Sequence, residues 1–175
     1  MMLAISRAQE HFSDGVRQIA FEFLVSLCER KAKMCARFPH FIAEVVRLCM
    51  DFMLELDDDE TWANTTDAWT ADVSNYDVGK ENIDRFAQSL RAGAVLDHVF
   101  TQVRSFVNHS GWKHKYVAIM TLSQCAETVQ DQAHVDEIVR LLIAQLADEH
   151  PRVRYAALHA IGQTSTDHSP YMQER

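Results

Sequence analysis

Residues 148–163 read DEHPRVRYAALHAIGQ, and residues 109–124, HSGWKHKYVAIMTLSQ, follow the same pattern without a gap. The two stretches lie 39 residues apart. Lys113 aligns with Arg152, and Tyr116 aligns with Tyr155. Self-similarity at a period near 40 residues is typical of two-helix repeats that stack into solenoids. The sequence therefore predicts an array of helix pairs.

A shorter signature occurs three times, as a base, a small residue and an aliphatic residue at positions i, i+3 and i+7. This spacing places all three side chains on one stripe of a helix. The first copy precedes the second by 98 residues, about 20 more than two periods. An acidic stretch over 57–79 is about that long, and we interpret it as an insertion. The three sets are Arg17, Ala20 and Leu24; Lys115, Ala118 and Leu122; and Arg154, Ala157 and Ile161.

The composition favours a folded, all-helical chain. It is 47% hydrophobic and 24% charged, with only 5 Gly and 3 Pro in 175 residues. Strand-and-turn architectures need more of both residues. No apolar run approaches the roughly 18 residues of a membrane span. Four cysteines, at positions 28, 35, 49 and 125, fall within helical patterns, and we expect reduced, mostly buried thiols.

We therefore predict an all-α HEAT-repeat α-solenoid, with antiparallel helix pairs stacked in a right-handed superhelix. Residues 1–175 form a single array of about four repeats, the end ones partial. Because neither end shows a polar capping repeat, we expect a segment of a longer solenoid. Ser13 and Asp14 are predicted to cap the first long helix, and Ser110 a later one. The predicted helices are 14–36, 39–56, 80–91, 94–108, 112–128, 133–147, 151–164 and one from Ser169-Pro170 onward.

The net charge of −8 is concentrated in the insertion, where residues 57–79 hold seven acids and no Lys or Arg. The rest of the chain has 18 acids against 17 bases. A concentrated acidic segment favours basic partners and repels nucleic acid. An exposed loop without a partner stays open as the alternative. A calcium loop starting at Asp57 is excluded, because its sixth and twelfth positions hold Trp62 and Ala68 instead of Gly and Glu.

Nothing in the sequence favours an enzyme, a cofactor or a metal. Cys28 and Cys35 are seven residues apart, and neither His nor a further Cys completes a zinc spacing. The chain has no Gly-rich phosphate loop, no nucleophile elbow and no catalytic carboxylate pair. Some helical-repeat enzymes cut glycosidic bonds in DNA, but these need a basic concave face. We expect neither nucleic-acid binding nor membrane association.

Several motifs in order suggest a family. Asn108-His-Ser-Gly-Trp112-Lys113 and Asp148-Glu-His-Pro-Arg-Val-Arg154-Tyr-Ala-Ala157 look like HEAT junctions. Together with Asp84-Arg85 and the run Asp57-Asp-Asp-Glu-Thr-Trp62-Ala63-Asn64, they resemble the importin-beta family of nuclear transport receptors (karyopherins), in particular its importin beta-3 branch. The resemblance covers about 57–175, whereas only the repeat period supports it over 1–56.

The resemblance implies a receptor that shuttles between cytoplasm and nucleus through the nuclear pore. Its implied partners are basic cargo proteins with nuclear localisation signals, the GTPase Ran and, in a full-length protein, nucleoporins. In the family an acidic loop on the inner, concave side contacts basic surface on Ran-GTP or cargo. The concave surface would be lined by helices 39–56, 94–108 and 133–147. The matching positions in the acidic loop are Asp57, Asp58, Asp59, Glu60 and Trp62.

After Trp62 the sequence departs from the family pattern, because Thr, Ala and Asn dilute the acids. Trp62 and Trp69 either anchor the loop on the helices or bind a partner. A HEAT-repeat scaffold or regulatory subunit unrelated to transport stays the alternative function, because periodicity alone does not separate the two.

Five residues are expected to join adjacent repeats. Asp148 and Arg154 lie six apart across a junction, where HEAT arrays place an acid–base ladder. Trp112 opens a helix and is predicted to pack between repeats. Arg152 is predicted to be exposed and free for acidic partners. The inter-repeat set is Asp148, Arg154, Lys115, Arg17 and Trp112.

Overall fold

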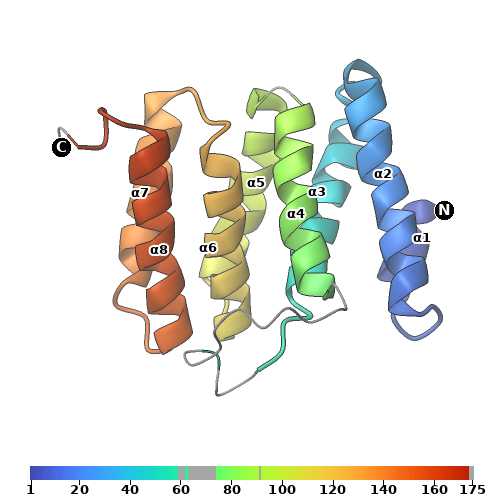
Figure 1. The fold of residues 1–175 in the computed structure, drawn as a ribbon, viewed down its shortest axis with the longest axis horizontal. Coiled ribbons are helices and arrows are strands. Elements are labelled where there is room, and N and C mark those ends of the chain that lie inside the picture. Colours follow the sequence, from blue (N-terminus) through green and yellow to red (C-terminus); the bar gives the residue numbers. More distant parts are fainter. Residues whose placement is uncertain (59–61, 63–73, 91, 174–175) are drawn as a thin grey trace.

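A computed structural model describes residues 1–58, 62, 74–90 and 92–173. These residues form eight α-helices and no strand (Figure 1). None of the helices so described has the length and apolar character needed to cross a membrane. The helices are α1 (Met2–Arg7), α2 (Asp14–Cys35), α3 (Pro39–Met53), α4 (Asn75–Ser89), α5 (Ala92–Val107), α6 (Trp112–Ala126), α7 (Gln132–Gln145) and α8 (Pro151–Asp167).

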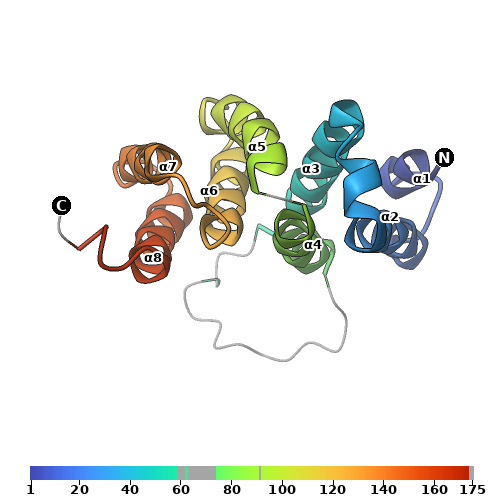
Figure 2. The same cartoon turned by 90° about the horizontal axis from the view of Figure 1, so that it is seen from above.

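The helices lie in two layers. Figure 2 shows α2, α4, α6 and α8 side by side in one layer and α1, α3, α5 and α7 in the other. Successive helices alternate between the layers, so each pair buries its facing stripes against the other layer and against the next pair. This is the predicted all-α HEAT-repeat solenoid, and the prediction of the fold class is confirmed.

One hydrophobic core runs the length of the array, from Phe21 in α2 to Ala160 in α8. Helix α3 shows how the sequence builds it. Its apolar residues recur at helical spacing on one stripe, and the whole stripe is buried. Burying one large apolar side chain contributes about 1.5–3 kcal/mol, so packing holds this helix more than propensity does. The stripe is Ile42, Val45, Val46, Cys49, Phe52 and Met53.

Helices α3 and α4 approach closely at Gly79. A Cβ atom at this position would lie 2.6 Å from the carbonyl oxygen of Cys49 and 2.8 Å from the Cγ of Met53. Real Cβ contacts are longer than this, so only the missing side chain of glycine permits the approach. The position of α4, and with it the end of the acidic insertion, therefore depends on Gly79.

The structure corrects three predictions about the helices: where α4 begins, which residue precedes α6, and a helix at Ser169-Pro170. Helix α4 begins at Asn75, inside the predicted insertion, because the Ser74 hydroxyl accepts a hydrogen bond from the Asp77 amide at 3.1 Å. Gly111, and not Ser110, precedes α6, and it provides no side-chain cap. The predicted helix at Ser169-Pro170 is wrong: residues 168–173 form turns, and the Ser169–Pro170 peptide is cis.

The four cysteines are buried and free, as predicted. Burial raises the pKa of the Cys125 thiol to about 12 and that of Cys49 well above its ordinary value. Such thiols stay protonated and unreactive near neutral pH. They act as small apolar core residues.

Candidate partner-binding site

The start of the acidic segment is held by two equivalent cations. The Lys113 ammonium on α6 donates a hydrogen bond to the carbonyl of Leu56 at 2.5 Å. The Arg152 guanidinium on α8 donates one to the next carbonyl, that of Asp57, at 3.1 Å. These cations occupy the same position in their repeats, 39 residues apart. The main chain is therefore fixed where the acidic run begins, while the side chains of Asp57 and Asp58 are exposed.

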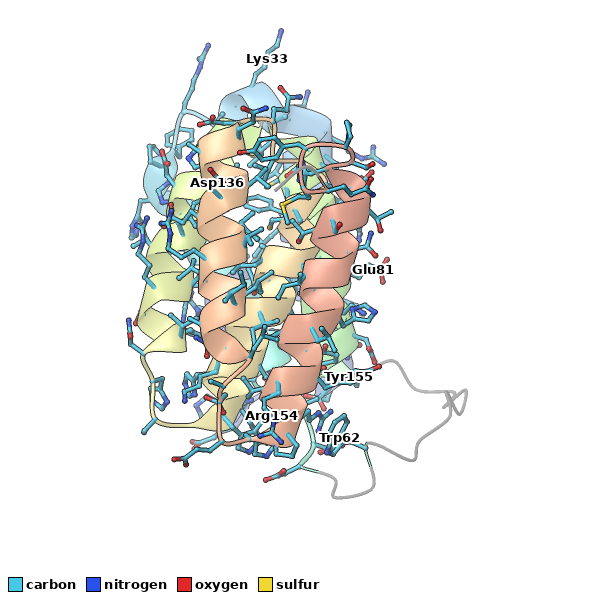
Figure 3. The ribbon with its side chains drawn as sticks, turned by 90° about the vertical axis from the view of Figure 1, so that its left-hand side faces the viewer. Lys33, Trp62, Glu81, Asp136, Arg154 and Tyr155 are labelled. Atoms are coloured by element: carbon cyan, nitrogen blue, oxygen red, sulfur yellow. The ribbon has the colours of Figure 1, made fainter. Side chains whose placement is uncertain are left out.

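Trp62 lies against α8. Its ring centroid is 5.6 Å from that of Tyr155, and the two side chains face each other at one end of the array (Figure 3). The Arg152 guanidinium lies 5.8 Å from the Trp62 ring. Contacts of this kind are what an anchoring role requires. A part for Trp62 in partner binding stays a prediction.

Arg152 is surrounded by three aromatic rings, two from α6 and one from the acidic segment. Its guanidinium lies 5.2 Å from the ring of Tyr116 and 5.4 Å from that of Trp112, in addition to Trp62. Each such cation–π contact contributes about 0.5–1 kcal/mol at a partly exposed site. The expectation that Arg152 is free for acidic partners is wrong, because the repeat junction brings the α6 rings against the first turn of α8.

Trp112 connects this cluster to the next junction. Its ring stacks on the imidazole of His150 with centroids 4.2 Å apart and planes 1° from parallel. On the other side, Tyr116 meets Trp112 edge-on, and its hydroxyl lies 3.3 Å from that of Tyr76 on α4. Burial raises the pKa of Tyr76, so the Tyr76 hydroxyl stays neutral. Trp112 therefore contacts the α7–α8 junction, in the position expected of a residue that packs between repeats.

The two ends of the insertion are joined to each other. The Asn75 amide at the start of α4 donates a hydrogen bond to the Glu55 carboxylate at 2.7 Å. Arg17 on α2 binds the same carboxylate with both terminal nitrogens, and its guanidinium lies 4.8 Å from the Phe52 ring. Glu55 and Asn75, which flank the acidic run in sequence, therefore meet in one polar cluster with Arg17.

This polar cluster is ionised. Burial alone would raise the pKa of Glu55, but hydrogen bonds from Arg17 and Asn75 outweigh it and hold that pKa below its usual range. The hydrogen bond with Glu55 in turn raises the pKa of Arg17. A charged pair with this many hydrogen bonds fixes geometry, because loss of either partner leaves the other buried and unpaired.

The predicted ladder pair is different from the one observed. The Asp148 carboxylate binds the Lys115 ammonium at 2.6 Å, whereas Arg154 donates to the main-chain carbonyls of Asp148 and Glu149, each at 2.8 Å. The Arg154 side chain lies next to the Asp148 backbone, so the carboxylate is left for α6. Burial opposes ionisation of Asp148, but the bonds from Lys115 and the His150 amide outweigh it and lower the pKa of Asp148.

The described part of the acidic segment lies with the α2, α4, α6 and α8 layer. All the contacts of Asp57 and Trp62 given above are to α8, and Leu56 just before them contacts Lys113 of α6; none is to α3, α5 or α7. We expected the acidic segment on the same side as helices 39–56, 94–108 and 133–147. Its described residues lie instead on the side of α6 and α8. Asp59, Glu60 and Trp69 lie outside the described residues. Within the described part of the chain, no group of three His, Cys, Asp or Glu side chains is arranged to hold a metal ion.

Sequence reasoning did not assign Lys113, Tyr116 and Tyr155 to this site. A signal was present, because Lys113 and Arg152, and Tyr116 and Tyr155, are matched positions of the 39-residue period. Both matched pairs face the acidic segment or the cluster that holds it. A cation and an aromatic residue that recur at the same positions of both repeats could therefore have indicated which residues hold the insertion.

Comparisons with known proteins agree with this architecture. The importin repeat family matches residues 9–97, and the HEAT-like repeat family matches residues 117–164. Importin subunit beta-3 of Saccharomyces cerevisiae is 28% identical over 163 residues, which is 90% of this chain and 15% of that protein.

Two solved structures of a karyopherin superpose closely. Kap121p bound to Nup53p has a TM-score of 0.89 at 26% identity, and Kap121p bound to RanGTP has a TM-score of 0.88 at 25% identity. Each comparison covers 99% of this chain, but only 17% and 18% of the respective karyopherin chains. The chain therefore spans about a sixth of the length of these relatives.

Proposed function

This chain belongs to the importin-beta family of karyopherins, and from that premise we propose that it is a protein-binding segment of a nuclear transport receptor. In this proposal its acidic segment recognises basic surface on cargo or on Ran-GTP. The helical surface of α3, α5 and α7 provides a second contact. The role is one of binding, not of catalysis.

The observation that supports this proposal most directly is the fixed start of the acidic run. Lys113 and Arg152 hold two consecutive carbonyls, and Trp62 rests on Tyr155 a few residues later. Holding the main chain lowers the entropy lost when a partner binds. The exposed carboxylates of Asp57 and Asp58 then act from a defined position, and Asp59 and Glu60 follow in sequence.

The relatives suggest which partners to test. Karyopherin structures with RanGTP and with Nup53p match almost the whole chain. By this similarity we propose Ran-GTP, nucleoporins and basic cargo carrying localisation signals as partners of the protein that contains this chain. Its location would then be the cytoplasm and the nucleus.

The test is a titration of the purified chain with Ran-GTP and with a Lys/Arg-rich localisation peptide, at low and near-physiological salt. The variant carries Asp57→Asn, Asp58→Asn, Asp59→Asn and Glu60→Gln. Exposed ion pairs contribute about 0–1 kcal/mol each, so loss of four should weaken binding about 10-fold or more at low salt. The matched control neutralises four exposed carboxylates elsewhere: Glu10, Glu81, Glu127 and Glu149.

Equal weakening in the variant and the control would reduce the effect to net charge and contradict a site at 57–60. Unchanged binding in the acidic variant would move the site to the helices. If the wild-type chain binds neither Ran-GTP nor the basic peptide, the scaffold function would be favoured.

A second variant tests whether the fixed geometry matters. Arg152→Gln removes the cation that holds the Asp57 carbonyl and contacts Trp62, but keeps all the acids. If preorganisation contributes, its affinity for the basic peptide falls while its net charge becomes more negative. Simple charge attraction predicts the opposite, a small gain in affinity.

A further inference from the structure

An apolar groove lies at the end of the array opposite Trp62. It has a volume of about 860 Å³ and lies between α1, the last turns of α2 and the start of α3. Met34 is 45% exposed and Phe38 is 58% exposed, so the groove offers apolar surface to solvent. Its apolar lining includes Leu3, Leu27, Met34, Cys35, Phe38 and Phe41.

Four cations stand beside this groove without partners. Within the described part of the chain, none of them forms an ion pair or donates a side-chain hydrogen bond, and all are exposed. Residues 30–41 contain no acid. Glu29, the neighbouring carboxylate, is bound by Arg85 of α4 at 2.9 Å. The four are Arg30, Lys31, Lys33 and Arg37.

The cations and the groove are parts of one surface. A second hollow, of about 510 Å³, is lined by residues 29–34 and Arg37, and it shares Met34 with the apolar groove. Helix α2 departs from helical geometry at Lys31, with φ −133° and ψ 36°, so its last turn is set apart from the body of the helix. A positively charged hollow therefore adjoins an apolar one at the end of a helix.

This arrangement is exceptional in a chain of net charge −8. Elsewhere the cations that the structure describes are often engaged, as in the pairs Arg17–Glu55, Arg85–Glu22 and Arg104–Glu137. A cluster of unpaired cations produces a local positive potential that attracts and orients anionic partners. Apolar surface beside it adds affinity that salt does not screen.

We propose that this groove binds an acidic peptide segment with a Phe or Leu anchor. The anchor fills the apolar groove, and the peptide carboxylates lie over Arg30, Lys31, Lys33 and Arg37. The chain then has two ends of opposite preference: one for basic partners at 57–62 and one for acidic partners at the α2–α3 turn. Figure 3 shows Lys33 at the top and Trp62 at the bottom of the view, beyond opposite ends of the helices.

The surface fits a peptide better than an anionic membrane. The groove is concave and takes an inserted side chain, whereas a membrane needs cations spread over a projecting face. On the opposite wall Arg7 is neutralised by Glu44 at 2.5 Å. Among the Lys and Arg side chains that the structure describes beside the groove, the unpaired ones therefore lie on the α2 side, which suits a peptide with acids on one side of its anchor.

The test uses a fluorescein-labelled peptide of Glu and Ser residues with one Phe, measured by anisotropy on the 175-residue chain and on the longer protein that contains it. Companion peptides carry Phe→Ala or all Glu→Gln. Lys33→Glu replaces an attraction with a repulsion and should weaken binding about 3–10-fold. Arg140→Glu makes the same charge change on an exposed residue of α7 and should leave the affinity nearly unchanged.

The apolar half has its own pair of variants. Met34→Gln keeps the length of the side chain but places a polar amide in the groove, and it should weaken the Phe peptide without changing the weak binding of the Ala peptide. Leu158→Gln, at an exposed position of α8, is the matched control. Circular dichroism checks that all four variants keep the wild-type helix content.

Equal binding of the Phe and Ala peptides, or an unchanged affinity in Lys33→Glu, would overturn the proposal. Binding of phosphatidylserine vesicles in place of the peptide would assign the surface to membranes and overturn it as well. Loss of peptide binding in the longer protein would show that another part of that protein covers the groove, and would overturn the proposal too.

Discussion

The α2–α3 and α6–α7 helix pairs each have a cation at the same position of the first helix, but one cation is buried and the other is partly exposed. Arg17 is the fourth residue of α2, and Lys115 is the fourth residue of α6. Each binds a carboxylate just past the following helix, Glu55 after α3 and Asp148 after α7. The Arg17 side chain is 3% exposed, whereas that of Lys115 is 26% exposed.

The difference follows from the number of donors. Arg17 satisfies the Glu55 carboxylate, the Asp14 carboxylate at 2.8 Å and the Ser6 carbonyl at 3.0 Å. A guanidinium has five donors in a rigid plane and can be buried in this way, whereas an ammonium is a strongly hydrated point charge. We call the Arg17–Glu55 ion pair the first joint and the Lys115–Asp148 ion pair the second joint. The two joints have the same geometry, but the first one has more hydrogen bonds.

The largest expected effect is that of Arg17→Ala. It leaves the Glu55 carboxylate and the Ser6 carbonyl in a buried site without their cation, and should lower the free energy of unfolding by about 3 kcal/mol. Urea denaturation at neutral pH measures the change. Arg17→Ala combined with Glu55→Gln removes the uncompensated charge and should recover part of the loss. Equal stability of the single and double variants would contradict a charge-based explanation.

A second prediction contrasts backbone packing at two glycines, one in α4 and one in α8. Gly79→Ala forces α4 away from α3 and should cost about 1–3 kcal/mol, because the new Cβ meets main-chain atoms that cannot rotate away. Gly162 in α8 has nothing within 4 Å of an added Cβ. Gly162→Ala should therefore stabilise the chain by about 0.5–1 kcal/mol through helix propensity. Thermal unfolding followed by circular dichroism compares the two, and a loss in both would place the cost outside packing.

Much of the fold was predictable because the same helix pattern occurs more than once in the sequence. The 39-residue period over 109–163 and the buried stripe of α3 indicated stacked helix pairs, and the observed helices follow most of the predicted ranges. The start of α4 was not predicted, because Ser74-Asn75-Tyr76-Asp77 is as polar as the insertion before it. Its cap is a local hydrogen bond, and burial of Asn75 depends on Glu55, which is 20 residues away in sequence.

The candidate site was only partly predictable for a related reason. The acids at 57–60 and Trp62 stand out by composition, since seven acids without a base are conspicuous. Which groups hold the segment depends on tertiary contacts such as Lys113 to Leu56, where a side chain binds a carbonyl that any residue would provide. Because every residue has a main-chain carbonyl, the pattern of side chains does not indicate which carbonyl accepts the hydrogen bond. For the same reason the Asp148–Arg154 pairing was wrong, since Arg154 binds carbonyls.

A smaller effect is expected at the second joint. Lys115→Ala should lower the free energy of unfolding by about 1 kcal/mol, because Asp148 keeps the hydrogen bond from the His150 amide and the Lys115 side chain that it loses as a partner is 26% exposed to water. Lys115→Met keeps the apolar stem and separates packing from charge. Urea denaturation of the two variants and of Arg17→Ala compares the loss of unfolding free energy at the two joints. Equal losses in Arg17→Ala and Lys115→Ala would contradict the conclusion that the first joint is the stronger one.

The smallest effect appears only in acid, and it distinguishes the joints by their carboxylates. Glu55 and Asp148 both have a lowered pKa in the folded chain, relative to ordinary values of 4.5 and 3.8. A carboxylate with a lowered pKa contributes stability that is fully present above its unfolded pKa and is lost as the pH falls through its folded pKa. The stability difference between wild type and Arg17→Ala should therefore be constant near neutrality and begin to shrink below about pH 4.5.

For Lys115→Ala the same convergence should begin at a lower pH, because an aspartate ionises at lower pH than a glutamate. Unfolding free energies measured against pH for wild type and both variants test this, and the acidic pairs that involve neither Arg17 nor Lys115 cancel in each difference. Glu55→Gln is the control for the first joint, since substitution of Arg17 in that background should leave only the smaller acid dependence of the exposed Arg17–Asp14 pair. A stability difference that stays constant well below pH 4 would mean that Glu55 is not the partner through which Arg17 stabilises the array. The carbonyl of Ser6 and the ring of Phe52 would then account for its contribution.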